Sequence, residues 1–187
     1  MNAELAPGLY IVATPIGNLG DLSPRAAHIL SNAAVVAVED SRVTAGLLRH
    51  IGVKRPMTPY HDHNAEHVRP GLIARMGSEA VALVSDAGTP LISDPGYKLV
   101  RDARAAGHLV VTIPGPCAAI AALTLAGLPT DRFLYCGFLP PKAQARAGER
   151  RVSASASAAS PSARLAGAAS PGGATTITIS PRGAASA

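Results

Sequence analysis

The chain has 187 residues, of which 48% are apolar and only 3% aromatic, with no Trp and a formal net charge of +5. An Ala-, Val-, Leu- and Ile-rich composition with few aromatic residues favours one domain with a parallel sheet between helices over a β-sandwich. No apolar run approaches the roughly 20 residues of a membrane span, and the first residues lack a secretion signal. Two cysteines are too few for a disulfide framework. We therefore expect a cytoplasmic protein that does not enter a membrane.

The positive charge is concentrated in the last quarter of the chain. Residues 1–141 hold two Lys, nine Arg and eleven acidic residues and are neutral overall, whereas residues 142–187 hold six basic residues and one acid. Composition therefore gives no support for a basic nucleic-acid-binding surface on the main body, although a local basic patch is compatible with zero net charge.

In chain order, short apolar runs alternate with helical patterns. Strands are predicted over residues 9–13, 34–38, 57–61, 80–84, 109–113 and 133–138. Helices are predicted from the Ser23–Pro24 cap to Asn32, over 43–51, from Pro70 to near Gly77, over 97–106 and over 117–126. Strands separated by helices imply right-handed βαβ units, so the predicted fold class is α/β with a mainly parallel sheet of about five strands.

The composition changes near residue 147. Residues 151–187 contain 12 Ala, 8 Ser, 4 Gly and 3 Pro, with no acidic and no aromatic residue. Such a segment buries too little apolar surface to offset its ordering entropy. We therefore predict an α/β domain over 1–146 and a disordered low-complexity tail over 147–187, with pairing of residues 177–179 as a minor alternative.

Three of the predicted strands end in loops rich in Gly and Pro. T-P-I-G-N-L-G-D follows the first strand, S-D-A-G-T-P follows residue 84, and P-G-P-C-A-A follows residue 113. Parallel strands bring their carboxyl ends to one edge, where ligands bind, and Gly and Pro make stiff loops whose main chain can approach a ligand closely. We predict a shallow pocket there for a nucleoside-like ligand, with Asp86 facing a ribose or a cationic centre.

Other kinds of site are less favoured. The sequence has no G-x-x-x-x-G-K-[ST], and Gly17 and Gly20 lack the spacing of G-x-G-x-x-G, which disfavours a P-loop nucleotidase and a dehydrogenase. H-D-H-N-A-E-H, at residues 61–67, contains groups that bind zinc, but no second cluster completes a shell, so we predict a polar loop facing the cleft and no metal. E-D-S-R, at residues 39–42, is either a helix start or a cleft-lining group.

Six blocks of the sequence occur together in one known family. They are T-P-I-G-N-L-G-D, A-V-E-D-S-R, H-D-H-N, A-L-V-S-D-A-G-T-P-L-I-S-D-P-G-Y, I-P-G-P-C-A-A-I-A-A-L and G-L-P-T-D-R-F, between about residues 8 and 142. Their order and spacing resemble the N-terminal domain of the bacterial methyltransferases that modify the ribose 2′-O of a cytidine in small-subunit (16S) rRNA, within the tetrapyrrole methylase superfamily. The resemblance implies two α/β domains with S-adenosyl-L-methionine in the cleft between them, an rRNA or assembled 30S substrate, and a homodimer.

The resemblance also implies which residues bind. The cofactor loops would contribute Thr14, Pro15, Ser85, Asp86, Ala87, Gly88, Thr89, Pro114, Gly115, Cys117 and Ala118. The substrate-side candidates are Asn18, Glu39, Asp40, Arg42 and His61. A ribose hydroxyl is a poor nucleophile that gains from a general base, and the sequence leaves Asp40 and His61 both open for that role.

The sequence departs from the family after F-L-P-P-K, at residues 138–142. The family continues into a second α/β domain, whereas here the low-complexity tail follows. We hypothesise that the tail is an out-of-frame translation of a GC-rich gene, which is wrong if neither other reading frame restores an α/β pattern after codon 148. Without the second domain we expect weak or no donor binding and impaired activity, and a low-micromolar calorimetric affinity would refute that expectation.

Two alternatives stay open beside rRNA methylation. One is methylation of a small molecule such as a tetrapyrrole, which an assay on small subunits against a precorrin would distinguish. The other is a non-catalytic remnant whose basic tail binds RNA non-specifically. Binding by the tail should weaken steeply with salt and disappear on deletion of residues 148–187.

Overall fold

The computed structural model describes residues 4–138 and 175–179, and the chain divides into two compact units, Met1–Cys117 and Ala118–Ala187. The first unit is built on β1 (Gly8–Val12), β2 (Val35–Val38), β3 (Met57–Pro59), β4 (Ala80–Leu83) and β5 (Val110–Ile113). These strands form one sheet in the order β3-β2-β4-β1-β5, and every neighbouring pair is parallel. The predicted α/β fold with a parallel sheet of about five strands is therefore confirmed.

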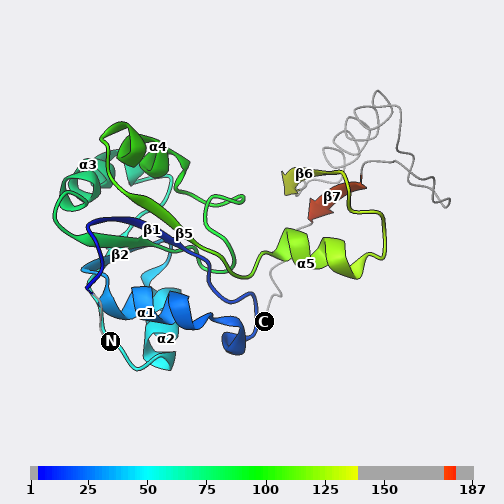
Figure 1. The fold of residues 1–187 in the computed structure, drawn as a ribbon, viewed down its shortest axis with the longest axis horizontal. Helices are drawn as coiled ribbons and strands as arrows, with labels where there is room; N and C mark the ends of the chain where they lie inside the picture. The colour runs from blue at the N-terminus through cyan, green and yellow to red at the C-terminus, as the bar shows by residue number, and fades with distance from the viewer. Residues whose placement is uncertain (1–3, 139–174, 180–187) are drawn as a thin grey trace. The chain divides into compact units, whose positions relative to one another are not determined.

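Helices cover both faces of this sheet (Figure 1). The α-helices of the first unit are α1 (Pro24–Asn32), α2 (Ser41–His50), α3 (Ala65–Arg75) and α4 (Tyr97–Ala105), and a short 3₁₀ helix, η1, spans Leu19–Asp21. Side chains alternate across a strand, so each central strand contributes to two cores. Val36 packs with Leu30 of α1 on one face, and Val81 packs with Leu99 of α4 on the other. Such doubly buried strands need the continuous apolar runs that the sequence has.

The starts of α1 and α2 follow from capping. The Ser23 hydroxyl accepts a hydrogen bond from Ala26 N–H at 3.1 Å, and Pro24 opens α1 as predicted. Helix α2 begins at Ser41, two residues before the predicted start, because Asp40 serves as its N-cap. The E-D-S-R block therefore contains a helix start, with Asp40 as the N-cap and Ser41 as the first helical residue.

Helix α3 begins five residues earlier than predicted. It starts at Ala65, and Pro70 lies inside it on the exposed side. The helix is initiated upstream, where Ala65 N–H and Asn64 N–H both donate to the carbonyl oxygen of His61. A proline inside a helix forgoes the N–H bond to the residue four positions before it, and that loss is tolerated here. The polar loop predicted over 61–67 is thus a turn at its start and the first turn of α3 at its end.

The second unit contains helix α5 (Ala118–Leu125) and the strands β6 (Phe133–Phe138) and β7 (Thr175–Ile179), which pair in parallel. No regular structure was expected at residues 175–179 beyond the minor alternative at 177–179. The run Thr-Thr-Ile-Thr-Ile is entirely β-branched, which favours a strand once a partner is present. The other residues of the predicted tail lie outside the described ones, so its disorder and the boundary at 146/147 stay predictions. Within residues 4–138 and 175–179, no helix has the length and apolarity to cross a membrane.

Candidate functional site

Three loops meet at one edge of the sheet. Strand β1 lies between β4 and β5, so the loops that follow these strands are neighbours. Thr14, just after β1, forms an isolated bridge with Gly88, with N–H to O distances of 2.9 and 3.1 Å. The buried Thr14 hydroxyl also donates to the carbonyl oxygen of Ser85 at 3.2 Å. The first two loops are therefore joined by both main-chain and side-chain hydrogen bonds.

The loop after β5 is attached to the same surface. Thr89 Oγ1 donates to the carbonyl oxygen of Pro116 at 2.9 Å. Gly115 lies so close to β1 that a Cβ on it would be 2.9 Å from the Cβ of Ala13. Gly88 has φ +89°, a backbone conformation that residues other than Gly rarely adopt. The predicted convergence of the three loops is thus confirmed, and their role in binding a donor stays a prediction.

Exposure divides the predicted cofactor residues into two groups. Thr14, Pro15, Ser85 and Gly88 are buried, with Asp86, Thr89 and Cys117 half-buried, whereas Ala87, Pro114, Gly115 and Ala118 are exposed. The exposed positions carry no polar side chain, so the surface offered there is main chain. Ala118 is the first residue of α5 and belongs to the second unit.

Asp40 has a structural role at the end of β2. Its carboxylate accepts the Arg42 N–H at 2.8 Å and forms an ion pair with the Arg42 guanidinium at 2.6 Å. The hydrogen bonds from Arg42 lower the pKa of Asp40 to about 2. A carboxylate this acidic and this fully engaged is a poor proton acceptor, so the geometry disfavours Asp40 as the general base.

Glu39 and His61 come together beside it. With Asp62, His63, Ser93, Asp94 and Pro95 they line an open pocket of about 390 Å³. Burial and the charges of Asp86 and Asp94 raise the pKa of Glu39. Two adjacent carboxyl groups, Glu39 and Asp40, therefore have pKa values displaced in opposite directions, which is a feature of acid–base sites.

Asn64 braces His61. The Asn64 side-chain oxygen accepts the His61 N–H at 2.9 Å, and the Asn64 amide donates to the carbonyl oxygen of Pro59 at 2.9 Å. The buried Nδ1 of His61 has no hydrogen-bond partner among the described residues. The rings of His61 and His63 pack edge to face with centroids 6.0 Å apart. Nδ1 is thus enclosed by protein and unpaired within the described part of the chain, while His61 as a residue lines the pocket.

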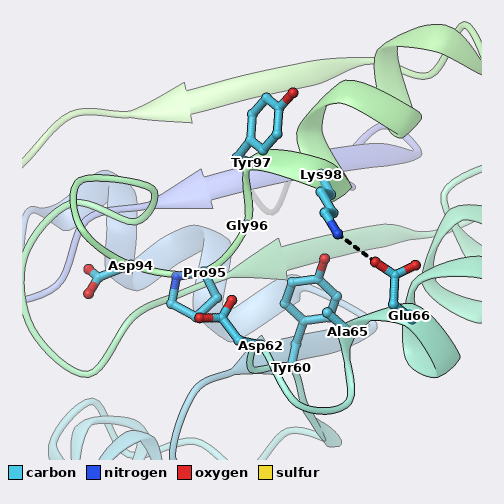
Figure 2. A pocket seen from close by; sticks show the side chains of 9 residues that line it. All are labelled: Tyr60, Asp62, Ala65, Glu66, Asp94, Pro95, Gly96, Tyr97 and Lys98. Carbon is cyan, nitrogen blue, oxygen red and sulfur yellow. Dashed lines mark hydrogen bonds and ion pairs between the residues drawn. The ribbon is translucent and has the colours of Figure 1, made fainter.

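A second pocket of about 150 Å³ adjoins the first and shares Asp62, Asp94 and Pro95 with it (Figure 2). Lys98 at the start of α4 forms an ion pair with Glu66 of α3 at 2.7 Å on its rim. Arg69 contacts the same carboxylate at 2.7 Å, and together these bonds lower the pKa of Glu66 to about 2. The charges on this side are therefore largely paired with one another.

The structure adds pocket residues that were not predicted and separates others. Ser93 and Asp94 line the larger pocket, together with Asp62 of the loop that was predicted to face the cleft. Ser93 has φ +64°, an unusual conformation for a residue other than Gly. Ser93 and Asp94 are the second Ser-Asp pair in V-S-D-A-G-T-P-L-I-S-D-P-G, and this repeat of the pair is the sequence signal that could have identified them as site residues. Two predicted substrate-side residues serve elsewhere: Asn18 accepts the Gly20 N–H in η1, and the exposed Arg42 is held by Asp40.

The pocket chemistry suits a hydroxyl-bearing or cationic ligand better than a free phosphate, because carboxylates outnumber basic groups along its walls. Within residues 4–138 and 175–179, no group of three or more His, Cys, Asp or Glu side chains has the geometry to hold a metal ion.

Comparison with known proteins identifies relatives of the chain. The chain is 58% identical over 142 residues to ribosomal RNA small subunit methyltransferase I of Xylella fastidiosa (Temecula1), covering 75% of this chain and 52% of the relative. It is 54% identical over 139 residues to the protein of the same name from Escherichia coli O157:H7, covering 74% and 49%. The chain thus spans about half the length of the curated relatives it matches.

Solved structures show the same fold. Uroporphyrin-III-C-methyltransferase from Thermus thermophilus matches with a TM-score of 0.53 at 26% identity, over 69% of this chain and 58% of that one. A conserved hypothetical protein, APE0931, from Aeropyrum pernix K1 matches with a TM-score of 0.60 at 25% identity, over 73% and 48%. The sequence model of the tetrapyrrole (corrin/porphyrin) methylases matches residues 8–167. The chain therefore belongs to the tetrapyrrole methylase family.

Proposed function

We propose that this chain carries the N-terminal half of the active site of an S-adenosyl-L-methionine-dependent methyltransferase that acts on small-subunit rRNA, at the 2′-O of a cytidine ribose. The observation that carries the proposal is the hydrogen-bonded junction of the loops after β4, β1 and β5, where Thr14 joins Gly88 and Thr89 joins Pro116. The names of the relatives support rRNA as the substrate.

The donor would lie against the exposed main chain of this junction. Main-chain groups of residues 14–15, 85–89 and 114–117 would hold its nucleoside and amino-acid parts. Methyl transfer from a sulfonium is an in-line displacement, so fixing the donor and the acceptor in line supplies much of the rate. Rigid loops stiffened by proline and joined by hydrogen bonds suit this task.

The acceptor would reach the pocket lined by Glu39 and His61. His61 is the candidate for the group that takes the proton of the ribose hydroxyl, because it lines the pocket while Asp40 is occupied by Arg42. Glu39 would accept a hydrogen bond from the ribose that receives the methyl group, or it would orient His61. The exposed Arg42 guanidinium, which is paired with Asp40, would be a contact for an RNA phosphate outside the pocket.

The proposal is tested by donor binding and by methyl transfer. Calorimetry with S-adenosyl-L-methionine measures the affinity of the purified chain, and tritiated donor with unmethylated 30S subunits measures transfer. We compare Gly115→Ala, whose Cβ would meet Ala13, with the control Gly46→Ala, whose Cβ would meet nothing within 4 Å. Loss of donor binding only in Gly115→Ala supports the site.

Methyl label on a ribose of the small-subunit rRNA supports the rRNA substrate, and label on a base or on a precorrin instead contradicts it. RNA binding that disappears on deletion of residues 148–187, with no donor binding by the intact chain, favours the non-catalytic remnant with a basic tail. Homodimerisation is expected from the family resemblance and is measured by sedimentation of the same sample.

A further inference from the structure

The main-chain N–H of Asp40 is left without a local acceptor by the sequence around it. Beyond the β2–β4 ladder, the last cross-strand bond runs from Val84 N–H to the carbonyl oxygen of Ala37 at 3.0 Å. In a capping box, the third residue of the helix reaches back to the N–H of the N-cap residue. Counting from Ser41, that third residue in α2 is Val43, which has no polar side-chain atom.

Asp86 supplies the missing acceptor from a distant part of the chain. Its Oδ1 accepts the Asp40 N–H at 3.0 Å, across a separation of 46 residues. A hydrogen bond to a carboxylate is stronger than one to a neutral acceptor, and a negative charge near the start of α2 is favourable to the helix dipole. The pair is a capping box closed through tertiary structure.

Asp86 is itself held in place by β1. Thr14 bonds to the carbonyl oxygen of Ser85, on one side of Asp86, and to both main-chain groups of Gly88 on the other. The loop that carries Asp86 is therefore anchored at two points. One end of β2 is attached in this way to the junction where the donor is proposed to lie.

The residue between these attachments is Glu39. Val38, on its N-terminal side, accepts the Tyr60 N–H at 2.7 Å, and Asp40, on its C-terminal side, is held by Asp86. The backbone of Glu39 is thus fixed on both sides, and its side chain lines the pocket with His61.

We propose that Asp86 is a positioning residue, which holds the Glu39–Asp40 turn through the Asp40 N–H and so keeps the Glu39 carboxylate in the pocket beside His61. This assigns Asp86 to the substrate side of the site, in place of the expected contact with the methyl donor. The substrate role of the turn rests on the proposed function, whereas the hydrogen bond and its consequence for the turn do not.

The experiment compares three variants of the full chain by amide hydrogen exchange at Asp40. Asp86→Ala removes the acceptor, Asp86→Asn keeps a side-chain oxygen in the same place, and Asp62→Ala removes a nearby charge without touching the Asp40 N–H. Loss of a hydrogen bond to a charged group corresponds to about 10- to 100-fold faster exchange. We expect the full acceleration in Asp86→Ala only, with a smaller one in Asp86→Asn, whose neutral oxygen is a weaker acceptor, and none in Asp62→Ala.

Carboxyl NMR of Glu39 provides a second readout. Asp86 and Asp62 both raise the pKa of Glu39 through their charges, so Asp86→Asn and Asp62→Ala should both lower it. Unchanged exchange at Asp40 in Asp86→Ala overturns the inference. So does a loss of donor affinity of more than about tenfold in Asp86→Asn with the Asp40 amide still protected, because that result places Asp86 on the donor. Absence of donor binding in the wild-type chain agrees with the expectation for one half of a two-domain site, and it leaves the exchange result to decide the inference.

Discussion

The hydroxyl of Thr14 is expected to hold the donor junction together, and Thr14→Val tests this directly. Valine keeps the shape of threonine, but it places a methyl group where the hydroxyl lies 3.2 Å from the carbonyl oxygen of Ser85. Thr14 is 2% exposed, so water cannot replace the lost donor. An unsatisfied buried acceptor costs about 1–3 kcal/mol of the free energy of unfolding.

Thr14→Ser is the matched control, because it keeps the hydroxyl and removes one buried methyl group, at about 1 kcal/mol. Urea denaturation measures both changes, and amide exchange at Gly88 reports on the junction itself. We expect Thr14→Val to release the Gly88 amide and Thr14→Ser to leave it protected. If Thr14→Ser costs as much as Thr14→Val and releases Gly88 equally, methyl packing joins the loops and the hydrogen bond does not.

Two further predictions concern the loop before α4. Gly96→Ala should lower the free energy of unfolding by more than Gly107→Ala. Both residues have positive φ (+132° and +77°), which costs another residue about 1–3 kcal/mol, but only at Gly96 would a Cβ also lie 2.9 Å from Leu83. Equal denaturation midpoints of the two variants would exclude the clash. Burial and the charge of Asp86 raise the pKa of Asp94 from its usual 3.8, so the folded state binds this proton more tightly than the unfolded state. Stability contributed by Asp94 is therefore lost as the pH rises from 3.8 through the raised value. Asp94→Asn should melt higher than wild type at pH 7 and show little difference at pH 3, and the reverse order would contradict the assigned burial.

The fold was predictable where the spacing of apolar residues agreed with the positions of the turn-forming and helix-capping residues. Four strands of the five-stranded sheet, all but β3, are short and mainly apolar runs, and Ser23–Pro24 marks the start of α1 correctly. The prediction for α3 was wrong because proline was taken as a helix start, whereas the turn at His61–Asn64 begins the helix and the exposed Pro70 is tolerated within it. Strand β7 lies in a segment whose sparse apolar residues predict disorder, and it pairs with β6, a strand far away in the sequence.

The candidate site was likewise predictable in part. The sequence by itself determined the three Gly- and Pro-rich loops and, through the parallel strands they follow, their common edge. Only the tertiary structure decided that β1 lies between β4 and β5 and that Asp86 reaches back to the start of α2. Local patterns report which backbone conformation each residue adopts, but a hydrogen bond between residues 46 positions apart depends on the order of strands in the sheet, and no local pattern contains that order.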